Sequence, residues 1–119
     1  MLKPNDLKIG NWVSIPGKGF TQIVAAKDID KVIKQGAEPI PTTAELVIAL
    51  GFSQRGESEL YEIAASNFVY HVGVKRIMIY HPGNMYTHWL GSHIDYVHQL
   101  QNIFYCIVGY DLTFKKVNL

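Results

Sequence analysis

The first part of the chain alternates apolar and polar positions in the pattern of a β-hairpin. Residues 7–15 have the two-residue period of a half-buried strand. Residues 16–19, Pro-Gly-Lys-Gly, are suited to a tight reversal, and residues 20–26 supply a partner strand. We therefore expect an N-terminal β-hairpin over residues 9–26. Residues 29–33 are a candidate for a third short strand.

A helix is predicted directly after the extended segment Pro39-Ile40-Pro41. Thr42 and Glu45 have the spacing of a capping box, in which each residue pairs with a backbone N–H of the first helical turn. The apolar positions that follow have helical spacing, and Gly51 is suited to end a helix. The expected helix spans about residues 43–50.

Most of the remaining chain has the pattern of short strands. Turn-forming residues at Ser66-Asn67, Gly73 and His81-Pro82-Gly83-Asn84 separate the apolar runs and favour tight antiparallel reversals. The expected strands cover residues 60–65, 68–72, 74–80, 85–90 and, at the end of the chain, 112–117.

A second helix is predicted over residues 93–108, capped by Ser92 and ended by Gly109. Its apolar residues cover an arc of about 200°, interrupted only by Gln101, so the helix is expected to be central in the fold. The opposite arc is polar but nearly uncharged. It holds Asp95, His98, Gln99, Asn102 and Cys106.

These elements predict an α+β fold: a small, mostly antiparallel sheet of about six to eight short strands, with an N-terminal β-hairpin and two helices. The chain has 119 residues, of which 48% are hydrophobic, and this is enough to bury a core. It has no interdomain linker pattern. A single domain over residues 1–119 is expected.

Charge and cysteine content narrow the functional classes. The formal net charge is +1, which gives little attraction for phosphate backbones or acidic membranes, so nucleic acid is not an expected partner. The single cysteine, Cys106, fits a reducing compartment. The polar start of the chain has no secretory signal pattern, and the longest apolar run, residues 103–108, is too short to span a bilayer. A cytoplasmic location is expected.

Ionised side chains are scarce between Ile77 and Phe114, where only Asp95 and Asp111 carry formal charges. The same stretch holds four of the five histidines and eight of the fourteen aromatic residues. This composition is typical of an interface core or a ligand pocket. It is also what a buried, strand-rich half of a domain would show, and the sequence leaves both interpretations open.

The candidate binding residues come from this stretch and from the basic pair before it. They would act by hydrogen bonding and by stacking. A nucleotide-like ligand would also need a basic rim, for which the interior pair Lys75-Arg76 is the candidate. The candidates are His98, Asn102 and Tyr105 on the last helix; Tyr80, His81, Tyr86 and Trp89 around the turn; and Lys75 and Arg76.

Reactive residue types occur, but at spacings that do not favour catalysis. Cys106, His98 and Asn102 are the types of a cysteine-protease triad, yet Cys106 and His98 lie eight positions apart, about 12 Å along one helix. A small buried or half-buried thiol at Cys106 is favoured instead. Asp95 and His98 form an i,i+3 pair that would orient an imidazole for acid–base work.

The histidines do not have the spacing of a metal site. His88, His93 and His98 recur every five residues, which turns a helix by about 140° and separates the side chains. His81 and His88 would meet across a hairpin, but two histidines alone do not make a ligand set. Neither a metal nor another cofactor is expected.

Three segments carry a resemblance to a known family. They are Leu7-Lys8-Ile9-Gly10-Asn11-Trp12-Val13, Pro39-Ile40-Pro41-Thr42 with the helix up to Gly51-Phe52, and Tyr96-Val97-His98-Gln99-Leu100-Gln101-Asn102-Ile103-Phe104-Tyr105. In these segments the chain resembles small uncharacterised proteins encoded by phages and mobile elements of Bacteroidota. The resemblance implies no enzymatic activity and no catalytic residues. It implies a small cytoplasmic protein that acts by binding.

The leading functional hypothesis is therefore a non-enzymatic binding protein of a phage or mobile element, acting as an inhibitor in counter-defence or host regulation. It would sequester a small nucleotide-like ligand or block a host protein, and it would form a homo-oligomer. A structural protein whose function is oligomerisation is the first alternative. A small enzyme that uses Asp95 and His98 is the second.

Overall fold

The structure is a computed structural model that describes residues 2–63, 68–81, 86–90 and 93–114. For residues 79–81 and 86–90 it describes the backbone alone. The chain divides into two compact units. The first contains the residues up to Pro41 together with Tyr96–Thr113, and the second contains Thr42–Asp95 together with Phe114. Each unit is described by itself, and the expected single-domain organisation stays a prediction.

The first unit begins with the expected hairpin. Strand β1 (Trp12–Ile15) pairs antiparallel with strand β2 (Gly19–Gln22). Gly17 and Gly19 both have positive φ, 81° and 85°, so the tight turn between the strands needs residues without a Cβ. A short 3-10 helix, η1 (Pro4–Asp6), precedes the hairpin. The N-terminal hairpin predicted from the sequence is confirmed.

The prediction of a strand at residues 29–33 is wrong, because this segment lies within helix α1 (Lys27–Lys34). Ile29, Val32 and Ile33 have i,i+3,i+4 spacing, so a helix brings all three to one face, where they pack against the core of the unit. Asp28 accepts a hydrogen bond from the backbone N–H of Ala25 at 3.1 Å and supports the start of the helix. The period of the apolar residues therefore favours a helix over a strand here.

Helix α3 (Val97–Val108) begins four residues later than predicted. Residues 93–95 are not helical, because the backbone of Ile94 and Asp95 pairs with other segments: the N–H of Ile94 bonds to the carbonyl of Lys75, and the carbonyl of Asp95 accepts from the N–H of Thr42. Tyr96 is the N-cap, and its backbone N–H donates to the side chain of Gln99 at 3.2 Å. The predicted end at Gly109, with φ 98°, is confirmed.

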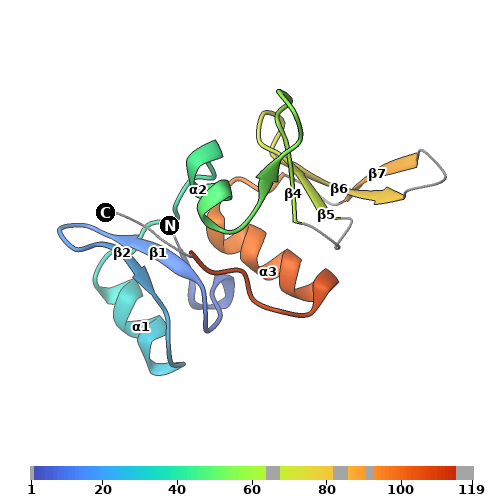
Figure 1. Cartoon of the computed structure of the whole chain (residues 1–119). Helices are drawn as coiled ribbons and strands as arrows, with labels where there is room; N and C mark the ends of the chain where they lie inside the picture. Colours follow the sequence, from blue (N-terminus) through green and yellow to red (C-terminus); the bar gives the residue numbers. More distant parts are fainter. Residues whose placement is uncertain (1, 64–67, 82–85, 91–92, 115–119) are drawn as a thin grey trace. The chain divides into compact units, whose positions relative to one another are not determined.

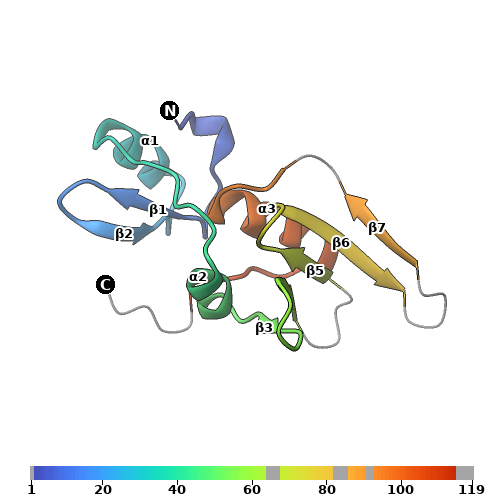
Figure 2. The same cartoon turned by 90° about the horizontal axis from the view of Figure 1, so that it is seen from above.

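The core of the first unit lies among η1, the hairpin and α1, whose elements are visible in Figures 1 and 2. It consists of Leu2, Leu7, Val13, Ile15, Ile23, Val32 and Ala37. Val13 and Ile15 alternate with the half-buried Trp12 and Ser14, as the strand period requires. No described helix of the chain is both long enough and apolar enough to cross a membrane.

The second unit contains an antiparallel sheet of five strands in the order β3-β4-β5-β6-β7 (Figures 1 and 2). The order follows the sequence, so each strand pairs with the next along the chain. The strands are β3 (Ser53–Gln54), β4 (Leu60–Glu62), β5 (Phe68–His71), β6 (Arg76–His81) and β7 (Tyr86–Leu90). With the hairpin and the helices, this sheet confirms the α+β class.

Helix α2 (Ala44–Ala49) precedes the sheet and lies where the sequence predicts it. Its N-cap, however, is Thr43 and not Thr42: the hydroxyl of Thr43 accepts from the N–H of Leu46 at 3.3 Å. The side chain of Thr42 is buried and has other partners. The chain beyond α3 also differs from prediction, since residues 112–114 are not a strand. The rest of that predicted strand and the turns at 66–67 and 82–84 lie outside the described residues.

A buried polar cluster around Tyr70 holds the second unit together. The Tyr70 hydroxyl lies 2.7 Å from that of Thr42 and donates to the carbonyl of Ile94 at 2.5 Å. Lys75 Nζ donates to the carbonyl and the hydroxyl of Thr42. Burial raises the pKa of Tyr70 to about 12, although its hydrogen bond with Thr42 acts in the opposite direction. The phenol therefore stays protonated and serves as a structural hydrogen-bonding group.

Candidate functional site

A hollow of the first unit lies between α3 and the segments that contain Leu2, Asp6 and Pro39. We call it the His98 pocket. It has a volume of about 540 Å³, within the range of small-molecule sites, which is roughly 300–1,000 Å³. Its lining is formed by Leu2, Asp6, Pro39, Tyr96, His98, Gln99, Asn102, Ile103 and Cys106.

His98 is the exceptional residue of this lining. Only 4% of its surface is exposed, and its Nδ1 atom is fully buried without a hydrogen-bond partner in the described part of the chain. Its ring lies nearly parallel to that of Tyr96, at an interplanar angle of 10° and a centroid distance of 6.1 Å. Burial lowers the pKa of His98, and the nearby Asp6 carboxylate opposes this only in part. At neutral pH the imidazole is therefore uncharged, with one N–H donor and one acceptor nitrogen.

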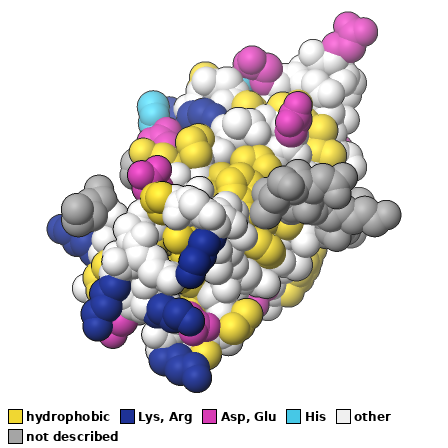
Figure 3. Space-filling model, turned by 90° about the vertical axis from the view of Figure 1, so that its left-hand side faces the viewer, with side chains coloured by type: hydrophobic (Ala, Val, Ile, Leu, Met, Phe, Trp, Pro, Cys, Tyr) yellow, Lys and Arg dark blue, Asp and Glu magenta, His cyan; other side chains and the backbone are white. Residues whose placement is uncertain are grey.

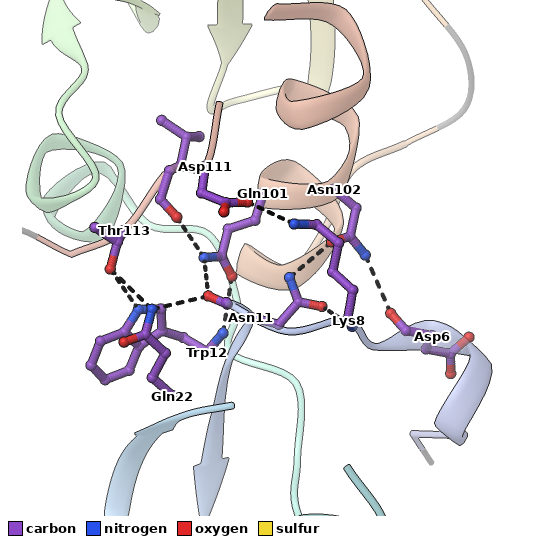
Figure 4. Close-up of polar contacts among 11 residues, drawn as sticks. Asp6, Lys8, Asn11, Trp12, Gln22, Gln101, Asn102, Asp111 and Thr113 are labelled. Atoms are coloured by element: carbon purple, nitrogen blue, oxygen red, sulfur yellow. Dashed lines mark hydrogen bonds and ion pairs between the residues drawn. The ribbon is translucent and has the colours of Figure 1, made fainter. Parts of the chain in front are cut away.

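Asn102 also lines the pocket, but its amide is occupied by protein atoms. Its Oδ1 accepts from Asn11 Nδ2 at 2.8 Å, and its Nδ2 donates to the carbonyl of Asp6 at 3.3 Å (Figure 4). Asn11 is itself fully buried and accepts from the N–H of Lys8 at 2.8 Å. Asn102 thus fixes the chain beside η1 against α3 and shapes the wall of the pocket.

Gln101, which interrupts the apolar arc in the sequence, is a structural anchor. It is 2% exposed, and its Oε1 accepts from the N–H of Trp12 at 2.9 Å. Its Nε2 donates to the carbonyls of Gly10 at 2.9 Å and Leu112 at 2.7 Å. Figure 4 shows these bonds between α3 and the segments on either side. We call this set of contacts the Gln101 junction; it holds α3 against the start of β1.

Tyr105, the third candidate binding residue on α3, and Cys106 differ in their relation to the pocket. Tyr105 is 46% exposed, is not among the lining residues, and has the Lys8 ammonium 4.5 Å from its ring centroid. Cys106 is exposed and lines the pocket, against the expectation of a buried or half-buried thiol. The predicted apolar arc of α3 is thus only partly buried, since Ile107 is exposed as well.

The candidates around the 81–84 turn belong to the second unit. Tyr80 and His81 are on β6, and Tyr86 and Trp89 are on β7, where the strand register sets His81 opposite Tyr86. Their side chains lie outside what the structure describes, and none of the four is among the described lining residues of the His98 pocket. Their role in binding stays a prediction.

The basic pair and Asp95 also belong to the second unit. The ammonium of Lys75 is bonded to Thr42, and Arg76 opens β6 opposite His71. Neither is among the described lining residues of the pocket. The charge of the Asp6 carboxylate acts on the His98 imidazole and opposes the lowering of its pKa.

Sequence reasoning missed Asp6, Leu2 and Pro39 as parts of the site. Asp6 lies about ninety residues from α3 in sequence, and no local pattern connects the two. The signal that could have found it is the side chain of Asn102, whose type suits a hydrogen bond to an exposed backbone carbonyl such as that of Asp6. Only the fold identifies which carbonyl that is.

A second, smaller hollow of about 220 Å³ lies between the hairpin and α1. Its lining includes Lys18 and Lys31, both exposed, and Asp28. On the face in Figure 3, Lys and Arg side chains stand separately and do not merge into one patch. Within the described ranges this hollow has no buried polar atom without a partner. It is less suited to a ligand than the His98 pocket.

Among the residues that the structure describes, no three His, Cys, Asp or Glu side chains lie together as a group that would hold a metal ion. Comparisons of the chain with protein-family models, with curated proteins and with solved structures found no match.

Proposed function

We propose that this protein is a non-enzymatic binding protein that sequesters a small ligand in the His98 pocket. The observation that carries the proposal is the buried imidazole of His98, whose Nδ1 has no partner among the described residues. A buried polar group without a hydrogen bond costs about 1–3 kcal/mol, and folded proteins rarely leave one. A bound ligand that pairs with the imidazole would remove this cost.

The lining of the pocket favours holding a ligand over transforming it. Cys106, the only thiol, is eight residues from His98 on the same helix, about 12 Å along its axis, so the imidazole cannot take its proton. Asn102 has both ends of its amide bonded to protein. The remaining lining is largely apolar, with Leu2, Pro39 and Ile103. Such a surface excludes water and orients a ring, which is sufficient for binding.

The biological setting that we propose is the cytoplasm of a host cell. The support is the resemblance of residues 7–13, 39–52 and 96–105 to small phage and mobile-element proteins of Bacteroidota. In that setting, a protein that captures a small host molecule would weaken a defence or regulatory response. The ligand would be of nucleotide-like size, which the volume of about 540 Å³ accommodates.

Nuclear magnetic resonance of the imidazole groups tests this function directly. The purified protein would be titrated with a panel of nucleosides, nucleotides and amino acids while the ring ¹⁵N signals of the five histidines are followed. We expect at least one class of compound to shift the His98 signals and to leave those of the exposed His93 in place. If no compound moves His98, and native mass spectrometry of protein purified from cells finds no retained small molecule, the proposal is wrong.

A second candidate function is the blocking of a host protein. It is favoured by the exposed apolar side chains of α3 and the residues after it: Tyr105, Ile107 and Tyr110 are 46%, 42% and 51% exposed. Aromatic residues on a surface are typical anchors of protein interfaces. Replacing Tyr105 and Tyr110 by glutamate would abolish capture of a protein partner but leave the His98 titration unchanged. The same variants would show by light scattering whether the partner is a second copy of the chain.

A further inference from the structure

The charges around the His98 pocket restrict what can enter it. Of its nine described lining residues, Asp6 alone carries a formal charge, and no lysine or arginine is among them. A phosphate group inside this lining would meet a carboxylate without a compensating cation, which is unfavourable in a partly desolvated site. The pocket is therefore electrostatically matched to an uncharged or positively charged group.

Two basic side chains considered for a phosphate, those of Lys8 and Lys75, have partners elsewhere. Lys8 Nζ forms an ion pair with Asp111 at 2.7 Å and also lies over the ring of Tyr105. Lys75, which the sequence suggests as a basic rim, donates to Thr42 in the second unit. Neither of these two ammonium groups can neutralise a phosphate without losing its present partner.

The polar groups that remain suit the edge of a nitrogen heterocycle. The neutral imidazole of His98 can donate or accept one hydrogen bond at each nitrogen, according to its tautomer. The carboxylate of Asp6 is an acceptor, so it suits a ligand that brings an N–H donor. The ring of Tyr96 and the apolar side chains of Leu2, Pro39 and Ile103 would contact the faces of a planar ring.

We infer that the His98 pocket binds an uncharged nitrogen heterocycle with an amino or ring N–H donor, of the aminopurine or aminopyrimidine class, and that it disfavours phosphate inside its lining. This inference rests on the proposed function, because it requires that the pocket binds a small ligand at all. It goes further in assigning recognition to the base and not to the phosphate of a nucleotide-like molecule.

The test compares adenosine and cytidine with their 5′-monophosphates, which carry the same rings with added negative charge. Cys106 is the only cysteine and is exposed in the pocket lining, so the rate at which a thiol reagent labels it reports occupancy. We expect a nucleoside to protect Cys106 and to shift the His98 ring signals. We expect its monophosphate to bind about tenfold more weakly at low salt, with a smaller difference at high salt.

Two matched variants separate the local charge from the net charge. Asp6→Asn removes the charge of the lining but keeps an oxygen that can accept from the backbone N–H of Lys3, as Asp6 does at 2.8 Å. Because the neutral amide no longer repels a phosphate, the variant should lower the ratio of nucleoside affinity to monophosphate affinity about fivefold, while the loss of the charged acceptor weakens both ligands alike. Asp30→Asn removes the same charge from an exposed position of α1 outside the lining, and it should change both affinities by less than about twofold.

The outcomes are distinguishable. Tighter binding of the monophosphate than of the nucleoside, or an equal effect of the two aspartate variants, would overturn the inference but leave a small-ligand binding protein. Binding only of compounds without a nitrogen heterocycle would also overturn the inference alone. A failure of every compound in the wider panel to move the His98 signals, together with no small molecule retained by protein purified from cells, would end both the inference and the proposed function.

Discussion

Two buried polar side chains lie three residues apart on α3, and they differ in their hydrogen bonding. Gln101 is 2% exposed and makes three hydrogen bonds, to the N–H of Trp12 and to the carbonyls of Gly10 and Leu112. His98 is 4% exposed, and its Nδ1 has no partner in the described chain. The two side chains are buried to nearly the same extent, but their hydrogen bonding differs.

This difference indicates that Gln101 has a structural role and that His98, on the same helix, has a role in binding. A buried amide that makes all of its hydrogen bonds stabilises the fold. Without it, the backbone groups that it contacts would be shielded from water and would have no hydrogen-bond partner in its place. A buried imidazole without a partner lowers stability, and such a group persists where binding needs it. The Gln101 junction and the His98 pocket therefore predict opposite responses to the same kind of substitution.

The largest expected effect is on the Gln101 junction. Gln101→Leu would leave the N–H of Trp12 and the carbonyl of Leu112 without this partner inside the protein, and should lower the free energy of unfolding by about 3 kcal/mol. The melting temperature should fall by roughly 10 °C, measured by circular dichroism. Ile107→Gln, at an exposed position of the same helix, is the control and should change stability by less than about 0.5 kcal/mol. A fall no larger than that of the control would contradict the structural role of Gln101.

The next effect concerns the wall of the pocket. Asn11→Ala removes the amide that bonds to the side chain of Asn102 and to the N–H of Lys8, and should cost about 2 kcal/mol of stability in urea unfolding. A double-mutant cycle with Asn102→Ala should give a coupling energy of about 1 kcal/mol. Strictly additive effects would show that the two amides do not act together.

His98→Leu should have the opposite sign. Leucine has a similar volume and no polar atom, so the free energy of unfolding should rise by about 1 kcal/mol while ligand binding is lost. Urea unfolding and the Cys106 labelling assay measure the two effects separately. His93→Leu, at an exposed position, is the control for stability. A clear loss of stability in His98→Leu would mean that the imidazole is bonded in solution and that the contrast with Gln101 is false.

The same contrast predicts a pH dependence. Burial lowers the pKa of His98 in the folded protein below its value of about 6.5 in the unfolded chain. Between these two pKa values the unfolded state binds more protons than the folded state, so the free energy of unfolding has its full value above about pH 6.5 and decreases as the pH falls toward the folded pKa. Unfolding in urea at several pH values should therefore show a shallower acid loss in His98→Gln than in the unchanged protein. Identical slopes would refute the assignment.

The smallest effect is expected at the surface of the first unit. Lys8 and Asp111 form an ion pair whose side chains are 34% and 55% exposed. Because water and salt screen such pairs, Asp111→Asn should lower the free energy of unfolding by about 0.5 kcal/mol at low salt and by less at about 0.5 M salt. An effect as large as that of Gln101→Leu would show that this pair, and not the junction, holds the segment around Asp111 in place.

Local sequence patterns predict most of the fold. The hairpin, α2 and strands β4 to β7 follow from alternation, turn residues and caps, all of which act within a few residues. Strand β3, with only two residues, was not predicted. The segment at residues 29–33 is harder, because a run of five residues fits either period, and the helix is favoured only when its apolar face meets the core. The start of α3 escapes prediction because the backbone of Ile94 and Asp95 pairs with segments far away in sequence.

The candidate site was predictable only in part. The sequence by itself determined that α3 has a nearly uncharged polar side, and that His98 and Asn102 belong to it. Only the tertiary structure decided that Asn102 is bonded to Asn11 and Asp6, that Gln101 is an anchor, and that Asp6 is the charge beside His98. The reason is physical: periodicity fixes the face on which a residue lies, whereas hydrogen-bond partners are brought together by chain closure over about ninety residues, which no local pattern encodes.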